Sequence, residues 1–238
     1  MRRILLTNDD GIRADGLVRL AAAAREFGEV WVVAPESQRS AASHAITLHA
    51  PIDAFPCAFP VPGIKAFALS GMPADCVRVG SLALMPEKPD VVLSGINYGY
   101  NTATDTQYSA TVGAALEAAF QGIHAIALSE GAHACHEVTD AYLADILREL
   151  IDRRLPRGRV YNVNFPHCAL KDCRGILRDR RLSYGTFYRD GYVLREELPG
   201  GGMRFAVKGE YNEDAEPDTD FRAIVDGYVS VGEISNLA

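Results

Sequence analysis

An amide, two carboxylates and a glycine, Asn8-Asp9-Asp10-Gly11, follow the apolar run at residues 4–6 after a single threonine, Thr7. Adjacent side chains of a strand point to opposite faces, so the two aspartates can converge only where the backbone turns beyond the strand. Two carboxylates that lie close together repel each other, and both stay ionised only when a cation sits between them. The pair therefore indicates a cation site. An ordinary solvated turn is the alternative, because Asn, Asp and Gly are common turn residues.

Two further oxygen-bearing side chains follow other predicted strands. Ser40 lies in the loop after the apolar run at residues 30–34, and Asn97 follows the run at residues 91–93. Ligands of a doubly wound sheet gather outside the carboxyl ends of its strands. Carboxylates, a hydroxyl and an amide oxygen form a hard donor set that suits Mg²⁺, Mn²⁺ or Ca²⁺. We therefore predict one divalent metal ion, Mg²⁺ or Mn²⁺ with Ca²⁺ as a crystal substitute, held by Asp9, Asp10, Ser40 and Asn97.

A helix predicted to begin near Ser109 offers an anion site beside these residues. Its first turn carries the hydroxyls of Ser109 and Thr111 together with free backbone N–H groups, and Asn101 can add an amide donor. We also count Asn8 among the predicted phosphate-binding residues. A metal beside an anion pocket suits hydrolysis of a phosphate ester, because the metal lowers the pKa of a bound water and neutralises charge on the phosphoryl group. Asp9 or Asp10 would then act as the catalytic base.

The order of apolar runs predicts an α/β fold with a Rossmann-like, doubly wound, mostly parallel sheet. Solid apolar runs are typical of buried parallel strands, and amphipathic stretches between them predict helices. The predicted strands are residues 2–7, 30–34, 64–69, 90–94, 125–129 and 160–165, with edge strands and loop at 46–62, and the predicted helices are residues 14–27, 73–84, 109–122 and 138–150.

The texture of the chain changes after residue 172, where tyrosine, glycine and charged residues become frequent. Alternating patterns replace the solid apolar runs, and Gly200-Gly201-Gly202 predicts a hairpin tip. We therefore expect a metal- and phosphate-binding α/β core at residues 1–172. A β-rich extension at residues 173–238 would serve oligomerisation, with its last strand returning to the core. A decorated edge of the same domain is the alternative.

Composition excludes several function classes. No apolar stretch of the 238 residues approaches the roughly 18 uncharged residues that a membrane span requires. The first residues carry no signal-peptide pattern, which predicts a cytoplasmic protein. The net charge of -7 argues against binding to a nucleic-acid polymer. Five cysteines without a C-x-x-C pair indicate reduced thiols. Neither a dinucleotide fingerprint nor a P-loop occurs at the first turn.

Seven short motifs, spread in order over nearly the whole chain, resemble those of the SurE survival-protein family. They are L-L-x-N-D-D-G at residues 5–11, A-P-E-x-x-x-S at 34–40, G-x-P-x-D-C-V at 71–77, S-G-I-N-x-G at 94–99, Y-S-x-T-V at 108–112, N-V-N-x-P at 162–166 and T-D-F with G-Y-V-S at 219–221 and 227–230. The resemblance implies a metal-dependent 5′/3′-nucleotidase that hydrolyses nucleoside monophosphates and forms homodimers or homotetramers through its carboxyl-terminal segments. It implies metal ligands at Asp9, Asp10, Ser40 and Asn97, and phosphate-binding residues at Asn101, Ser109 and Thr111.

The chain departs from the family pattern around this site. Ala41, Ala103 and Ala110 stand where the family usually has glycine, and Tyr100 replaces a proline. An alanine held at positive φ costs about 1–2 kcal/mol and can reshape a loop. Tyr100 can stack on a base or close the pocket. His44 can donate a proton to the leaving oxygen or be a surface histidine.

Three alternative functions stay open from the residues alone. A haloacid-dehalogenase-like phosphatase would form an aspartyl-phosphate, but such enzymes usually present D-x-D, whereas Asp9 and Asp10 are adjacent. A receiver-like Mg²⁺-binding signalling module would need a third aspartate, and Ser94-Gly95 occupies the comparable loop. A family member whose loop changes abolished catalysis would be a nucleotide-binding protein.

Overall fold

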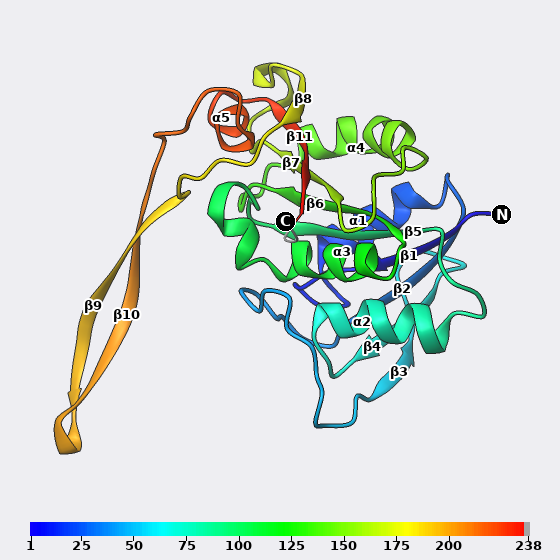
Figure 1. Ribbon diagram of the computed structural model, residues 1–238, viewed down its shortest axis with the longest axis horizontal. Helices are drawn as coiled ribbons and strands as arrows, with labels where there is room; N and C mark the ends of the chain where they lie inside the picture. The colour runs from blue at the N-terminus through cyan, green and yellow to red at the C-terminus, as the bar shows by residue number, and fades with distance from the viewer. Residues whose placement is uncertain (236–238) are drawn as a thin grey trace.

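The computed structural model describes residues 1–235 and contains a central nine-stranded sheet (Figure 1). The strand order is β3-β4-β2-β1-β5-β6-β7-β11-β8. The strands are β1 (Arg3–Thr7), β2 (Glu29–Pro35), β3 (Ala54–Cys57), β4 (Lys65–Leu69), β5 (Val91–Tyr98), β6 (His124–Glu130), β7 (Val160–Phe165), β8 (Ile176–Arg180) and β11 (Val229–Ile234). The six neighbouring strands β4, β2, β1, β5, β6 and β7 pair in parallel. Strand β3 runs antiparallel to β4, and β11 runs antiparallel to β7. The predicted α/β class is confirmed.

Helices cover both faces of this sheet (Figure 1). Helices α1 (Asp15–Ala24) and α4 (Glu137–Leu150) share one apolar cluster with Ile4 and Leu6 of β1. Helices α2 (Pro73–Val79) and α3 (Ala110–Phe120) share the other cluster with Leu5. Because successive side chains of a strand alternate between faces, the three leucine and isoleucine residues of β1 bind the two helical layers to one sheet.

Strand β1 lies at the switch point of the sheet, where the chain changes the side on which it adds new strands. From β1 the chain builds β2 and β4 on one side, and then returns to place β5, β6 and β7 on the other side. Thr7 at the end of β1 is paired with Ser94 of β5. Ligands of open α/β sheets bind outside the carboxyl ends of the strands at such a switch point. The fold thus directs attention to the residues that follow β1 and β5.

Most elements differ from their predicted bounds, and three of these differences affect the sheet or the shape of a helix. Strand β5 continues past a bulge to Tyr98, because Asn97 and Tyr98 pair with Ser129 and Glu130 of β6. Helix α2 ends at Val79, and a π-helical turn, Gly80–Leu84, completes the predicted helix. The segment 46–62, all of which the structure describes, holds a single strand, β3, at the sheet edge. Its Pro56 is tolerated there because an edge strand has one unpaired side.

A two-stranded arm projects away from the sheet (Figure 1). It consists of β9 (Tyr188–Leu198) and β10 (Gly202–Tyr211), which pair antiparallel around Pro199–Gly201, as the predicted hairpin tip requires. The rest of the segment after residue 172 joins the main sheet, where β11 lies between β7 and β8. The short helix α5 (Asp220–Val225) precedes β11. The domain division at residue 172 stays a prediction. Within residues 1–235, no helix has the length and apolar character to span a membrane.

Candidate active site

The turn after β1 is closed by the buried side chain of Asn8. Its Nδ2 donates to the Gly11 carbonyl at 3.0 Å, and its Oδ1 accepts from the Gly11 N–H at 3.2 Å. Gly11 has φ 102°, a conformation that glycine adopts without steric cost. The N–H of Ile12 donates to the Pro35 carbonyl at 2.8 Å, which ties the turn to the end of β2. Asn8 therefore positions the two aspartates, and its phosphate-binding role stays a prediction.

Asp9 is almost fully buried at the end of this turn. Its Oδ1 accepts a hydrogen bond from the Thr111 hydroxyl at 2.6 Å. The pKa of Asp9 is raised to about 6, because burial and, to a smaller extent, the charge of Asp10 raise it by more than the Thr111 hydrogen bond lowers it. A buried carboxylate with an acidic neighbour is the electrostatic setting that a cation relieves.

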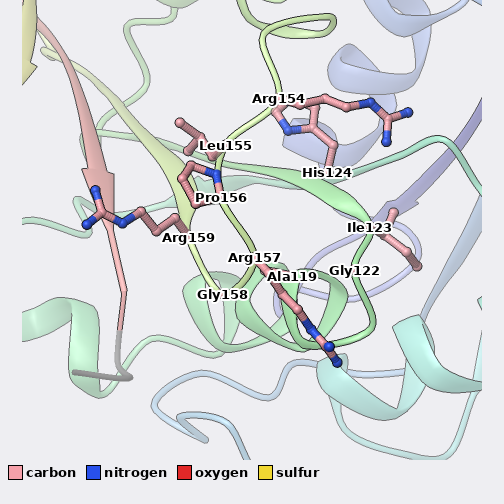
Figure 2. Close-up of a pocket in the computed structure, with 10 residues that line it drawn as sticks. All are labelled: Ala119, Gly122, Ile123, His124, Arg154, Leu155, Pro156, Arg157, Gly158 and Arg159. Carbon is pink, nitrogen blue, oxygen red and sulfur yellow. The ribbon is translucent and has the colours of Figure 1, made fainter.

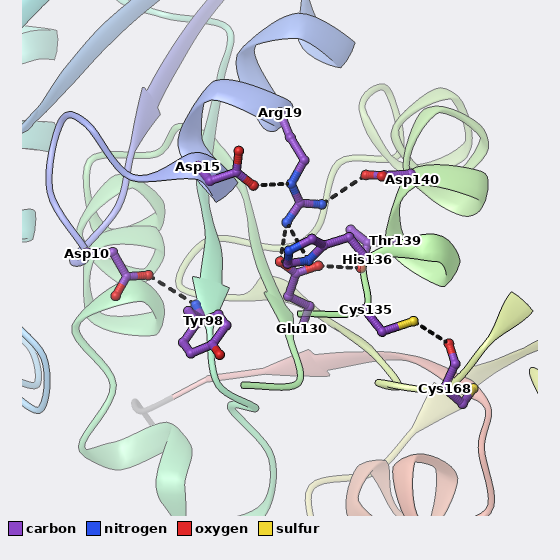
Figure 3. Close-up of polar contacts among 10 residues, drawn as sticks. All are labelled: Asp10, Asp15, Arg19, Tyr98, Glu130, Cys135, His136, Thr139, Asp140 and Cys168. Carbon is purple, nitrogen blue, oxygen red and sulfur yellow. Dashed lines mark hydrogen bonds and ion pairs between the residues drawn. The ribbon is translucent and has the colours of Figure 1, made fainter. Parts of the chain in front are cut away.

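Asp10 is half-buried and faces the other side of the turn. Its Oδ2 accepts from the Tyr98 N–H at 3.0 Å (Figure 3). Gln38 Nε2 donates to Ser40 Oγ at 3.0 Å and lies 3.5 Å from Asp10 Oδ1. Burial raises the pKa of Asp10. Gln38 lies in the loop after β2, and no sequence pattern had singled it out. It connects two of the predicted metal ligands, Asp10 and Ser40.

Asn97, at the end of β5, places its amide oxygen near Thr111. Its Nδ2 donates to the Gly99 carbonyl at 2.8 Å, and its Oδ1 lies 3.4 Å from the Thr111 hydroxyl. The Thr111 hydroxyl therefore lies near both an amide oxygen of β5 and the Asp9 carboxylate, which follows β1. These all-oxygen donors fit a hard divalent cation. Thr111, predicted to bind phosphate, lies against two of the predicted metal ligands.

A cavity of about 370 Å³ opens over these residues. Its walls include Asp9, Ser40, Asn97, Tyr100, Asn101 and Ser109. Ser109 caps α3, because its hydroxyl accepts from the Val112 N–H at 3.1 Å. Asn101 is buried and donates from Nδ2 to the Ser129 hydroxyl at 2.8 Å. The structure thus brings five of the predicted metal and phosphate residues, from four separate segments, to one cavity, whereas Asp10 lines a neighbouring cavity and Asn8 and Thr111 line neither.

Two carboxylates that sequence reasoning missed also line this cavity, Asp105 and Asp190. Burial raises the pKa of Asp105, and the charge of Asp190 raises it further. Asp105 lies in a short 3₁₀ helix, Ala103–Gln107, whereas Asp190 belongs to the arm. No local pattern links residues so far apart in the chain, so only the folded structure identifies the pair.

Two of the three departures from glycine adopt the left-handed backbone conformation. Ala41 has φ 57° and Ala103 has φ 53°. Ala110 is instead the first residue of helix α3. The cost of an alanine at positive φ therefore applies to Ala41 and Ala103 and does not apply to Ala110. Because the two alanines hold a conformation typical of glycine, their loops keep that shape at a conformational cost.

A network of paired charges lies near Asp10, and Figure 3 shows both. Arg19 of α1 forms ion pairs with the buried Glu130 of β6, with Asp15 at 2.8 Å and with Asp140 of α4 at 2.9 Å. Thr139 donates a hydrogen bond to Glu130 at 2.7 Å. The network joins three elements beside the site. Because its charges are already paired, we assign it a structural role.

His44 and His124 both lie away from the site cavity. His44 Nε2 is 3.1 Å from Glu117 Oε2, and its ring stacks on Phe120 at 5.3 Å, so the side chain packs on α3 outside the cavity lining. His124 lines a cavity near the start of β6 (Figure 2), and its Nε2 lies 2.9 Å from the Leu150 carbonyl. The guanidinium groups of Arg154, Arg157 and Arg159 around it point in different directions, so they do not converge on an anion (Figure 2).

Comparison with known proteins agrees with this architecture. The family described as survival protein SurE matches residues 4–184. The 5′/3′-nucleotidase SurE of Cronobacter sakazakii is 42% identical over 231 residues, covering 96% of this chain and 88% of that protein. The 5′-nucleotidase SurE of Geobacter sulfurreducens is 41% identical over 238 residues, covering 96% and 86%. The crystal structure of the SurE protein from Aquifex aeolicus superimposes with a TM-score of 0.81 at 32% identity, covering 99% of this chain and 94% of that one. The chain belongs to the SurE family.

Proposed function

We propose that this protein is a divalent-metal-dependent phosphomonoesterase that hydrolyses nucleoside monophosphates to nucleoside and phosphate. The observation that carries the proposal is the convergence of Asp9, Ser40 and Asn97 on one cavity at the start of helix α3. The names of the relatives, 5′/3′-nucleotidase and 5′-nucleotidase, support the same substrate class. The reaction would be hydrolysis at the 5′ or the 3′ position.

The four oxygen donors Asp9, Asp10, Ser40 and Asn97 would hold the metal. A bound divalent ion supplies positive charge for the phosphoryl oxygens and lowers the pKa of water. The contribution of the chain is to orient the donors: Thr111 directs the Asp9 carboxylate. The backbone N–H of Tyr98 directs Asp10 in the same way. One of the two carboxylates would accept the proton of the attacking water.

The start of helix α3 would bind the phosphate. Its first N–H groups are directed along the helix axis toward the end that Ser109 caps, where the helix dipole favours an anion. Ser109 and Asn101 line the same cavity as Asp9 and supply further polar atoms. A phosphate in this position would lie between the predicted metal ligands and the helix.

The backbone conformation of two alanines beside the site favours an active enzyme over the alternative of a catalytically impaired, nucleotide-binding protein. Ala41 and Ala103 adopt left-handed backbone conformations typical of glycine at these positions. Both residues flank the site, next to Ser40 and within the 3₁₀ helix that carries Asp105. We therefore expect turnover in this chain.

Phosphate release from a panel of nucleoside monophosphates tests the proposal. We expect release with Mn²⁺ or Mg²⁺ that EDTA abolishes and that Asp9→Asn reduces by at least two orders of magnitude. Equal release by the wild type and Asp9→Asn would refute it. A hydroxylamine-sensitive acyl-phosphate would point instead to the aspartyl-phosphate mechanism. Stable self-phosphorylation by a small phosphodonor, without nucleotide hydrolysis, would point to a receiver-like module.

We also propose that the arm mediates self-association. Tyr192 pairs with Val207, and Leu194 pairs with Phe205, so these four side chains share one face of the hairpin. They are exposed by 71%, 64%, 48% and 52% respectively. An apolar strip on a projecting hairpin is typical of a surface that a second protein chain covers. The proposed partner is a second copy of this chain, in a homodimer or homotetramer.

A further inference from the structure

A second cavity, of about 330 Å³, adjoins the metal and phosphate cavity. Its walls are aromatic and imidazole side chains: Tyr100, His133, His167, Phe187, Tyr188 and Tyr211. Tyr100 and Tyr188 line both cavities, so the two spaces meet at these tyrosines. We call the second space the aromatic cavity.

Several contacts hold the rings of the aromatic cavity in place. The Tyr100 hydroxyl accepts from the His167 N–H at 2.8 Å and also bonds Nδ1 of the same residue. A Cβ on Gly131 would lie 2.6 Å from the Tyr100 hydroxyl and 2.5 Å from the His167 Cβ, so a glycine leaves room for both. Tyr100 also meets Phe187 edge-on at 5.4 Å. The cavity wall is thus a connected set of rings.

The base of the arm forms the opposite wall. The Phe187 ring is buried and lies 4.9 Å from the ring of Tyr211 and 5.0 Å from the ring of Tyr188. Phe187 is itself anchored on the fully buried Phe221 at 5.4 Å. Tyr188 and Tyr211 remain about half exposed. Tyr188 and Tyr211 therefore present ring surface to a ligand, while Phe187, which contacts both rings, is held in the core.

Two of these rings, those of Tyr100 and His167, are held in their neutral forms near pH 7. Burial raises the pKa of the Tyr100 phenol. Burial and the neighbouring His133 lower the pKa of His167. Neutral aromatic faces stack on a nucleobase, and imidazole nitrogens can hydrogen-bond to its edge. This chemistry differs from that of the oxygen-rich cavity beside it, which suits a metal and a phosphate.

We propose that the aromatic cavity binds the nucleobase of the substrate, while its phosphate occupies the adjoining cavity. A nucleoside monophosphate carries its base and its phosphate on opposite sides of one sugar, and Tyr100 and Tyr188 would flank that sugar. The inference rests on the proposed phosphomonoesterase function and adds to it the residues that select the base. The enzyme prefers phosphate esters that carry an aromatic base over esters of simple alcohols.

The test compares adenosine 5′-monophosphate with glycerol phosphate, which has no base. Tyr211 lines the aromatic cavity but not the metal and phosphate cavity, so its substitution separates the two. In Tyr211→Ala, the KM for the nucleotide relative to that for glycerol phosphate rises at least about fivefold, as loss of about 1 kcal/mol of stacking requires. Tyr211→Phe keeps the ring and stays within about twofold of the wild type.

Two controls keep the outcome interpretable. Tyr184→Ala alters an exposed tyrosine shortly before the arm that lines neither cavity, and it leaves the KM ratio unchanged. His133→Ala removes a second wall residue and raises the ratio in the same direction as Tyr211→Ala. Calorimetric titration with adenosine, which lacks the phosphate, shows weaker binding to Tyr211→Ala than to Tyr211→Phe.

The possible failures are distinguishable. Phosphate release from both substrates with an unchanged KM ratio in Tyr211→Ala and His133→Ala overturns the base site and leaves the phosphomonoesterase function standing. No metal-dependent release from either substrate overturns the proposed function and the base site with it. Equal adenosine affinity in Tyr211→Ala and Tyr211→Phe also overturns the base site.

Discussion

Replacing Ala41 by glycine should stabilise the protein. Ala41 follows the predicted metal ligand Ser40 and has φ 57°. In the left-handed region the Cβ of an L-residue crowds the following carbonyl oxygen, which costs about 1–2 kcal/mol, whereas glycine has no Cβ. Ala41 is exposed, so its methyl group contributes little burial to the free energy of unfolding. The substitution therefore removes strain and sacrifices almost no packing.

The opposing contribution comes from the unfolded chain. Glycine has more conformations to lose on folding than alanine, which destabilises the folded state by about 0.4–1 kcal/mol. The net gain for Ala41→Gly is then about 0.5–1 kcal/mol, which corresponds to a rise of about 1–4 °C in Tm for a chain of this size. At the fully buried Ala103, loss of the methyl group near Phe187 and Phe221 costs about a further 0.8 kcal/mol, so the expected change there is near zero.

Ala42 provides a matched control. It is the next residue in the loop and, unlike Ala41, is not among the described residues with positive φ. Ala42→Gly should therefore destabilise the protein by about 0.4–1 kcal/mol. Urea unfolding can be followed by the fluorescence of the buried Trp31. If Ala41→Gly proves no more stable than Ala42→Gly, the strain argument for this loop is wrong.

Three further predictions concern the site and the arm. Thr111→Val removes the hydrogen bond to the Asp9 carboxylate, worth about 1.5–3 kcal/mol, so half-maximal activity should need at least about tenfold more Mn²⁺, while Thr111→Ser should match the wild type. Gly113→Ala would place a Cβ 2.5 Å from the Ser43 carbonyl oxygen. The loop of Ser43 must then shift, and we expect lower Tm and a kcat/KM reduced at least about tenfold in phosphate-release assays, whereas unchanged values would show that α3 tolerates the methyl group. Val207→Lys places a charge on the apolar face of the arm and should yield a smaller species by sedimentation velocity, and an unchanged sedimentation coefficient would contradict a role of this face in assembly.

The sequence by itself determined the α/β fold and identified the residues of the proposed metal site. Buried parallel strands need apolar residues on both faces, so runs such as Ile4-Leu5-Leu6 are recognisable without any knowledge of their neighbours. The acidic turn after the first run was also recognisable from local residues. Asn8 and Gly11 are typical turn residues, and their hydrogen bonds join atoms of one short segment. Signals of this kind depend on residues close together in the chain.

Only the tertiary structure decided how these residues meet. Strand β5 reaches Tyr98 because it pairs with β6, and Thr111 turns to Asp9 because α3 begins beside β1. The aromatic cavity joins Tyr100 to Tyr211, which no local pattern connects. The left-handed φ of Ala41 is likewise set by the surrounding loop contacts, against the intrinsic preference of alanine. Contacts between distant segments depend on how the elements pack, and local periodicity carries no record of that packing.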